Sequence, residues 1–147
     1  MLETAYKITS DFIFINQPNS DKDVYLFEKG LKTFYSDWTS HRNLLTSYDF
    51  FKMLNPKKIE CTINEFIIFK SRPILSSADN NIIALETIPN QHHYDENKHP
   101  YKNSNIKLED VYENIGVFIS LKDNIKLDEY YGKVLGDKKI VYDSRKQ

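Results

Sequence analysis

Glycine and cysteine are scarce in this chain, whose 147 residues include four Gly and one Cys. The glycines stand at positions 30, 116, 132 and 136, too far apart for a P-loop or a dinucleotide-binding loop, since both need closely spaced glycines around phosphate. A single cysteine, Cys61, excludes an intramolecular disulfide and is typical of a reducing compartment. Because Cys61 lies on the same side as two Ile in the alternating stretch 59–63, we expect it to be a small buried hydrophobic residue.

Long hydrophobic runs and an excess of one charge are also absent. The apolar runs reach four residues, as in 12–15 and 66–69, whereas a membrane-spanning helix needs about 20. The first residues lack a basic segment followed by an apolar stretch, so we expect no secretion signal. With 20 Lys and Arg against 21 Asp and Glu, the chain lacks the basic excess of a nucleic-acid binder. We therefore expect a soluble cytoplasmic protein that binds neither nucleic acid nor membranes.

Aromatic side chains are what the chain has in abundance, with ten Tyr, nine Phe and one Trp. Each buried ring removes a large apolar area from water, so these residues can form a core or a partner surface. The rings and the branched aliphatic residues recur at periods typical of helices and strands. A chain of this length is expected to form one domain.

The periodicity predicts an α+β fold, a helical hairpin packed on a mostly antiparallel sheet, as a single domain over 1–147. The first helix of the hairpin is expected to begin after Ser20 and to carry Val24, Phe27, Leu31, Phe34 and Trp38 on one face. The second is expected over 40–54, before Pro56. Strands are expected at 5–15, 59–63, 66–69, 82–88, 117–121 and 139–142, with an antiparallel meander in the middle, a short helix at 108–114 and an ambiguous helical stretch at 125–135.

Residues 89–106 form the longest polar stretch and have no period of 2 or 3.6, which predicts a long loop. Three histidines, His92, His93 and His99, lie there with Asp95 and Glu96 between them. Imidazole and carboxylate groups are metal ligands, so these histidines are candidate ligands for a metal-dependent hydrolase or nuclease. Their spacing matches no zinc motif, and the simpler interpretation is a solvated loop with no metal and no cofactor.

Acidic residues and tyrosines gather in two segments near the C-terminal end. The members are Glu109, Asp110, Tyr112, Glu113, Asp128, Glu129, Tyr130 and Tyr131. Tyrosine rings give anchoring area at an interface, and carboxylates steer a basic partner toward it. These eight residues are the predicted partner-binding surface, and the expected partner is a protein, for example a basic toxin.

No arrangement of catalytic residues is recognisable in the sequence, which favours a binding protein over an enzyme. The function that fits best is a non-catalytic protein-binding domain, most like an inhibitor or immunity protein that occludes a toxin or an enzyme. Two alternatives stay open. One is the metal-dependent hydrolase or nuclease using the histidine loop, and the other is a structural or assembly subunit. The oligomeric state does not follow from the sequence.

Overall fold

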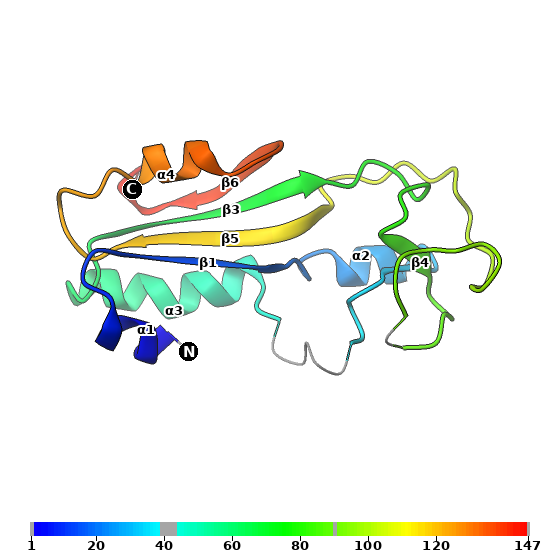
Figure 1. Cartoon of the computed structure of the whole chain (residues 1–147), viewed down its shortest axis with the longest axis horizontal. Helices are drawn as coiled ribbons and strands as arrows, with labels where there is room; N and C mark the ends of the chain where they lie inside the picture. The colour runs from blue at the N-terminus through cyan, green and yellow to red at the C-terminus, as the bar shows by residue number, and fades with distance from the viewer. Residues whose placement is uncertain (1, 39–43, 90, 147) are drawn as a thin grey trace.

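The computed structural model describes residues 2–38, 44–89 and 91–146. Its centre is an antiparallel sheet of four strands in the order β1–β5–β3–β6, which are Phe12–Pro18, Tyr112–Ser120, Glu65–Pro73 and Lys138–Asp143. Helices α1 (Leu2–Ile8) and α3 (Ser47–Ile59) lie on one face of this sheet, and α4 (Leu127–Lys133) lies on the other (Figure 1). A 3-10 turn, Ser144–Lys146, ends the described chain. The prediction of an α+β fold with an antiparallel sheet is confirmed.

A smaller unit extends from the end of the sheet at which β5 begins (Figure 1). It contains α2 (Asp23–Phe27) and a two-stranded antiparallel sheet of β2 (Leu31–Thr33) and β4 (Ile82–Ala84). Its own cluster of buried side chains is formed by Leu26, Leu31, Ile74, Ile82, Leu108 and Val111. No helix in the described part of the chain has the length and apolar character needed to cross a lipid bilayer.

The two faces of the four-stranded sheet follow from the alternation of side chains along each strand. On the α3 side, Phe66 and Ile68 of β3 and Val117 of β5 pack with Phe50 and Leu54 of α3, and all five are buried. On the α4 side, Ile67 and Phe69 pack with Phe118 of β5 and Leu127 of α4. The continuous apolar run 66–69 is therefore a strand covered on both faces, as its pattern predicts.

Helix α3 begins and ends with hydrogen-bonded caps. The Thr46 hydroxyl accepts from the Asp49 amide while the Asp49 carboxylate accepts from the Thr46 amide, which is a capping box. Pro56 lies inside the helix, so the expected stop at this residue is wrong. The helix ends instead in a Schellman motif, in which Cys61 (φ 59°) and Thr62 donate to the carbonyls of Lys58 and Lys57.

Three sequence-based expectations fail around this helix. Residues 59–63 form the helix end and the turn that follows, and Cys61 is exposed, because the last helical carbonyls are satisfied by this turn. The helix expected over 40–54 begins at Ser47, and residues 40–43 of that prediction lie outside the described residues. The remaining mismatch is at the N-terminal end, where a strand was expected over 5–15 and the chain forms α1 before β1.

The expected helical hairpin is wrong because its first helix is short. Helix α2 ends after Phe27, and Gly30 then adopts a φ of 71°, a left-handed conformation that turns the chain into β2. Leu26 and Leu31 are buried, whereas Val24 and Phe27 of the expected apolar face are 70% and 59% exposed. Only α3 of the predicted pair therefore packs on the sheet.

The strand pairing differs from a meander. β3 and β4 belong to different sheets, and β5, which follows the polar loop, lies between β1 and β3. Residues 112–114, expected in a short helix, are the first residues of β5, while α4 and β6 lie within the expected stretches 125–135 and around 139–142. Local apolar periodicity does not encode which strands pair, since that depends on contacts distant in sequence.

The polar loop 89–106 contains no helix or strand in its described residues, as predicted. It is fastened to the small unit by Lys102, which is buried and whose ammonium group donates to the carbonyls of Asp79 and Ile82 at 2.8 and 2.7 Å. The same ammonium lies 4.2 Å from the centre of the Tyr94 ring. Burial lowers the pKa of Lys102, which is the direction expected when a cation leaves water.

Candidate functional site

Four of the five carboxylates of the predicted partner-binding surface are engaged in ion pairs within the chain, and the fifth, Glu109, is exposed and is held by its backbone amide, which donates to the Tyr25 hydroxyl. Asp110 lies 2.6 Å from Lys139, and Glu113 lies 3.8 Å from Arg72. Asp128 accepts two hydrogen bonds of 2.9 Å from Arg145, and Glu129 lies 3.8 Å from Lys126. Hydrogen bonds from Lys139 and Arg145 lower the pKa of Asp110 and of Asp128, respectively. Their negative charge is thus compensated locally, which weakens the field that they offer to a basic partner.

The tyrosines of that surface hold α4 against the sheet. The Tyr130 ring packs on Phe12 with 4.3 Å between ring centres and a tilt of 30°, and the Tyr131 ring meets Phe69 edge-on at 5.4 Å. Burial raises the pKa of Tyr131, and the neighbouring Tyr112 adds to this. The structure therefore brings Tyr112 near Tyr131, and Tyr130 and Tyr131 act as packing residues on the α4 side.

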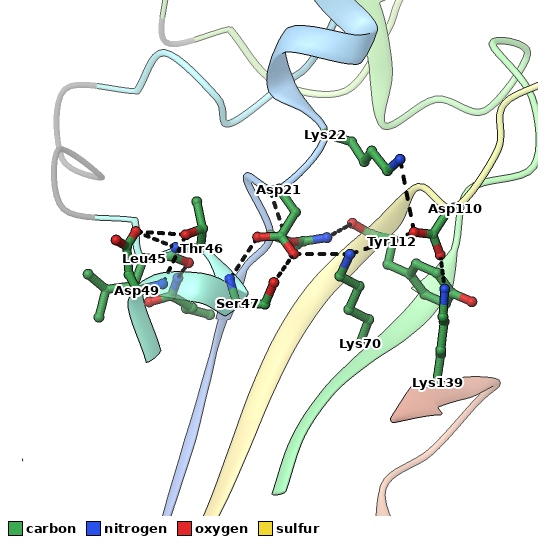
Figure 2. Close-up of polar contacts among 12 residues, drawn as sticks. Asp21, Lys22, Leu45, Thr46, Ser47, Asp49, Lys70, Asp110, Tyr112 and Lys139 are labelled. Carbon is green, nitrogen blue, oxygen red and sulfur yellow. Dashed lines mark hydrogen bonds and ion pairs between the residues drawn. The ribbon is translucent and has the colours of Figure 1, made fainter. Parts of the chain in front are cut away.

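A buried ion-pair network lies where the small unit joins the large sheet (Figure 2). Lys70 is only 6% exposed, and its ammonium group lies 3.0 Å from the Asp21 carboxylate and 3.9 Å from Asp110. Asp21 also accepts hydrogen bonds from the backbone amide and the hydroxyl of Ser47, at 2.8 and 2.6 Å. The network ties the segment after β1 to the start of α3, to β3 and to the entry into β5.

A carboxyl group with an unusual proton affinity lies beside this network. Burial, together with the charge of Asp21, raises the pKa of Asp23 to about 6. Burial also raises the pKa of Tyr35, whose hydroxyl donates to the carbonyls of Glu113 and Asn19 at 2.8 and 3.2 Å. An acid that titrates near neutral pH can transfer protons. The Tyr35 hydroxyl is engaged with backbone carbonyls of the chain itself, and so we assign this cluster to the attachment of the small unit.

The histidines of the polar loop make separate local contacts. His99 accepts a hydrogen bond from the Asp95 amide at 3.0 Å, and the His93 ring lies 4.3 Å from the Phe34 ring. The His92 ring meets Trp38 edge-on at 5.7 Å. Within residues 2–38, 44–89 and 91–146, no three His, Cys, Asp or Glu side chains are placed to hold a metal ion. The observed contacts do not favour the metal-dependent alternative.

A concave surface lies on the α4 side of the sheet, and we call it the aromatic groove. It has a volume of about 470 Å³ and is lined by Phe12, Phe14, Ser71, Arg72, Phe118, Tyr130, Lys133, Val134 and Leu135. Strands β1 and β5 form its floor, and α4 with the two residues that follow it forms one wall. A mostly apolar groove of this size with a few polar groups is typical of a binding site.

The floor of the aromatic groove is a row of parallel rings. Phe14 stacks on Phe118 with 4.6 Å between ring centres, and Phe118 stacks on Phe69 at 5.5 Å. Gly116 makes this row possible, because an ideal Cβ at that position would lie 2.4 Å from the tip of the Phe69 ring. At the solvent end of the row Phe14 is 46% exposed, although it stands on a strand. This exposed ring is a ready contact point for another molecule.

The charges at the aromatic groove are positive. Its charged lining residues are Arg72 and Lys133, and no lining residue is acidic. Arg72 is held near the groove by its backbone, which adopts a φ of 57° and donates to the Asp137 carbonyl. The Lys133 ammonium lies 5.4 Å from the centre of the Tyr130 ring. An apolar floor with two cations favours a ligand that combines apolar groups with negative charge.

Sequence reasoning identified only Tyr130 among the residues that line the groove. The other lining residues come from β1, β3, β5, the last residue of α4 and the two residues after it, which the strand order brings together. One signal was available, because Phe12 and Phe14 alternate with Ile13 and Ile15 and so predict aromatic rings on one face of an apolar strand. Comparisons of this chain with protein-family models, with curated proteins and with solved structures give no match.

Proposed function

We propose that this chain is a protein-binding domain that uses the aromatic groove as its contact site. In this proposal it acts in the cytoplasm as an inhibitor or immunity protein that covers a functional surface of a toxin or an enzyme. The observation that carries the proposal is the stacked row Phe14–Phe118–Phe69, which ends in a solvent-exposed ring beside an open groove. Partly exposed aromatic residues in concave surfaces supply much of the energy of protein interfaces.

The chemistry of the groove indicates the character of the partner. Lys133 and Arg72 provide the positive charge of the lining, and the charge of Arg72 is compensated in part by Glu113, 3.8 Å away. We therefore propose that the contacting segment of the partner is apolar and carries at least one carboxylate. A basic partner recognised through the acidic–tyrosine segments stays a prediction, and the ion pairs of Asp110 and Asp128 make that surface the weaker candidate.

Selection from a displayed library of random 12-residue peptides tests this proposal. Wild-type protein should select peptides that share apolar residues and Asp or Glu, and one of these peptides is then synthesised with a fluorescent label. We expect Phe14→Ser to weaken the binding of that peptide by roughly tenfold or more, because one exposed ring is lost from the contact. Higher salt should also weaken binding, since two cations contribute.

The matched control is Val141→Ser, on the other outer strand, β6. Val141 is 39% exposed, close to the value for Phe14, and does not line the aromatic groove. Its substitution should leave peptide binding unchanged. A selection that yields no shared sequence pattern, or a selected peptide that binds Phe14→Ser as tightly as wild type, would overturn the proposed function.

A further inference from the structure

Strand β1 forms an outer edge of the four-stranded sheet, with β5 as its neighbour on the inner side. Hydrogen bonds at both ends of this pair show which residues bond to β5. The Asn19 amide donates to the Glu113 carbonyl at 2.9 Å, and the Leu121 amide donates to the Asp11 carbonyl at 2.8 Å. Because antiparallel strands bond through alternate residues, the odd-numbered residues of β1 direct their backbone groups toward β5. The even-numbered residues direct theirs outward.

The outward backbone groups belong to Phe12, Phe14 and Asn16. Among the described residues, none outside the strand forms a hydrogen bond with these groups. Two of the three residues, Phe12 and Phe14, also place their side chains in the lining of the aromatic groove. A row of free backbone donors and acceptors thus runs alongside an apolar groove. This combination is typical of sites that bind an extended segment as an additional strand.

We propose, building on the proposed function, that the partner segment binds as a fifth strand along β1 of this chain. Its backbone pairs with Phe12, Phe14 and Asn16, and its alternate apolar side chains lie beside the Phe14 and Phe118 rings. Its carboxylate lies toward Lys133 and Arg72. Backbone pairing supplies affinity, and the groove selects the side chains.

Charge argues for a different protein rather than a second copy of this chain as the occupant. If two copies paired through β1, each would present Phe12, Phe14 and Asn16 to the groove side of the other, and none of these carries a carboxylate. Lys133, for which the described residues provide a ring contact and no ion pair, would then gain no counterion, whereas Arg72 already has Glu113. An acidic, apolar strand from another protein satisfies both the free edge and the positive charge.

The test compares Asn16→Pro with Asn16→Thr, using the labelled peptide from the selection. Proline at 16 removes one outward N–H and leaves the bonds to β5 intact, while threonine keeps the N–H and suits a strand. We expect roughly tenfold weaker binding to Asn16→Pro and nearly wild-type binding to Asn16→Thr. A peptide that is weakened by Phe14→Ser but not by Asn16→Pro would refute strand addition and leave the proposed function standing. If Phe14→Ser, Asn16→Pro and Asn16→Thr all bind the peptide as tightly as the wild type does, both strand addition and the proposed function are refuted.

A second measurement needs no variant and therefore does not depend on the folding of Asn16→Pro. N-methylation of the peptide at successive amides should weaken binding at every second position, because only alternate residues of an added strand bond to β1. The absence of this period of two would overturn the proposal. Sedimentation equilibrium addresses the second copy. A wild-type dimer that Asn16→Pro dissociates and Asn16→Thr preserves would also overturn it, since the edge would then belong to a copy of the chain.

Discussion

The replacement Gly116→Ala tests whether the floor of the aromatic groove is as tightly packed as the structure shows. The added Cβ would lie 2.4 and 2.6 Å from two carbon atoms of the Phe69 ring, whereas carbon atoms in contact are about 3.5–4.0 Å apart. Phe69 is fully buried, with Phe118 and Tyr131 packed against its ring. The ring therefore has to shift by about 1 Å against two other rings.

The expected loss of stability follows from the size of this overlap. Overpacking a buried site by one methyl group costs about 1–3 kcal/mol, and an overlap of more than about 1 Å with an enclosed ring belongs at the upper end. Alanine restricts the unfolded chain and so offsets about 0.5 kcal/mol of this cost. We expect the free energy of unfolding to fall by about 2.5 kcal/mol. With a urea dependence of about 2 kcal/mol per M, the unfolding midpoint should fall by roughly 1.2 M.

Gly132→Ala is the matched control for this measurement. Gly132 lies in α4, and a Cβ there would have no heavy atom within 4 Å. This variant should be more stable than wild type by about 0.5–1 kcal/mol, because alanine favours a helix. In addition, Phe69→Leu in the Gly116→Ala background should recover part of the loss by shortening the side chain. A Gly116→Ala midpoint within about 0.3 M of wild type would refute the argument that Phe69 needs the bare glycine.

Three further predictions concern the network and the helix cap. Lys70→Met should lower the free energy of unfolding by about 3 kcal/mol, because it leaves Asp21 buried without its cation. Lys139→Met removes a cation from an exposed ion pair and should lower the free energy of unfolding by less than about 1 kcal/mol. Equal urea midpoints for the two variants would contradict this. The pKa of Asp23 is raised by folding from 3.8 to about 6, so the folded state holds this proton more tightly and the wild type loses stability as the pH rises through that range. Asp23→Asn should therefore gain about 1–2 kcal/mol over wild type at pH 7.5, after allowance for partial exposure, and clearly less at pH 4; the same difference in unfolding free energy at both pH values would exclude the shift. Thr46→Ala should lower the free energy of unfolding by about 1 kcal/mol, because the side-chain cap of α3 is lost. Thr46→Ser keeps the capping hydroxyl and should retain wild-type stability. Thermal melting of the two variants therefore distinguishes loss of the cap from loss of side-chain volume.

The helices and strands that the sequence predicts well are those whose apolar residues are the ones buried by the neighbouring layers of the fold. The run 66–69 is a strand covered on both faces, and the stretch 117–121 contains most of the C-terminal half of β5. For both, the apolar residues are those that the two neighbouring layers bury. The polar loop 89–106 was also predictable, because its residues offer no apolar face to either layer.

The first predicted helix shows where periodicity misleads. Residues 24, 27, 31, 34 and 38 have helical spacing, but Gly30 takes a left-handed conformation in the middle of the pattern. The burial of Leu31 in β2 against Ile82 and the small-unit core outweighs the helical preference of the segment. Tertiary packing of this kind overrides a local pattern, since most helical stability comes from the buried face.

Charged residues were harder to place from sequence than apolar ones. Lys70 continues the apolar run 66–69 and has the appearance of a surface charge at the end of a strand, yet it is buried against Asp21. Lys70 and Asp21 are 49 residues apart in the sequence, and the local sequence around either one does not predict their contact. A buried lysine needs a counterion, so its position on a doubly covered strand was the available signal.

The aromatic groove exists because the helix on that face is much shorter than the strands beneath it. α4 has seven residues and a length of about 10 Å, whereas the nine residues of β5 extend over about 30 Å. The helix cannot continue, since Val134 adopts an extended conformation and Gly136, at a φ of 80°, turns the chain directly into β6. On the opposite face, α3 has 13 residues and is about twice as long as α4. Part of the ring row on the α4 side is therefore left open because α4 is short, and Phe14 remains 46% exposed beside the outer edge of β1.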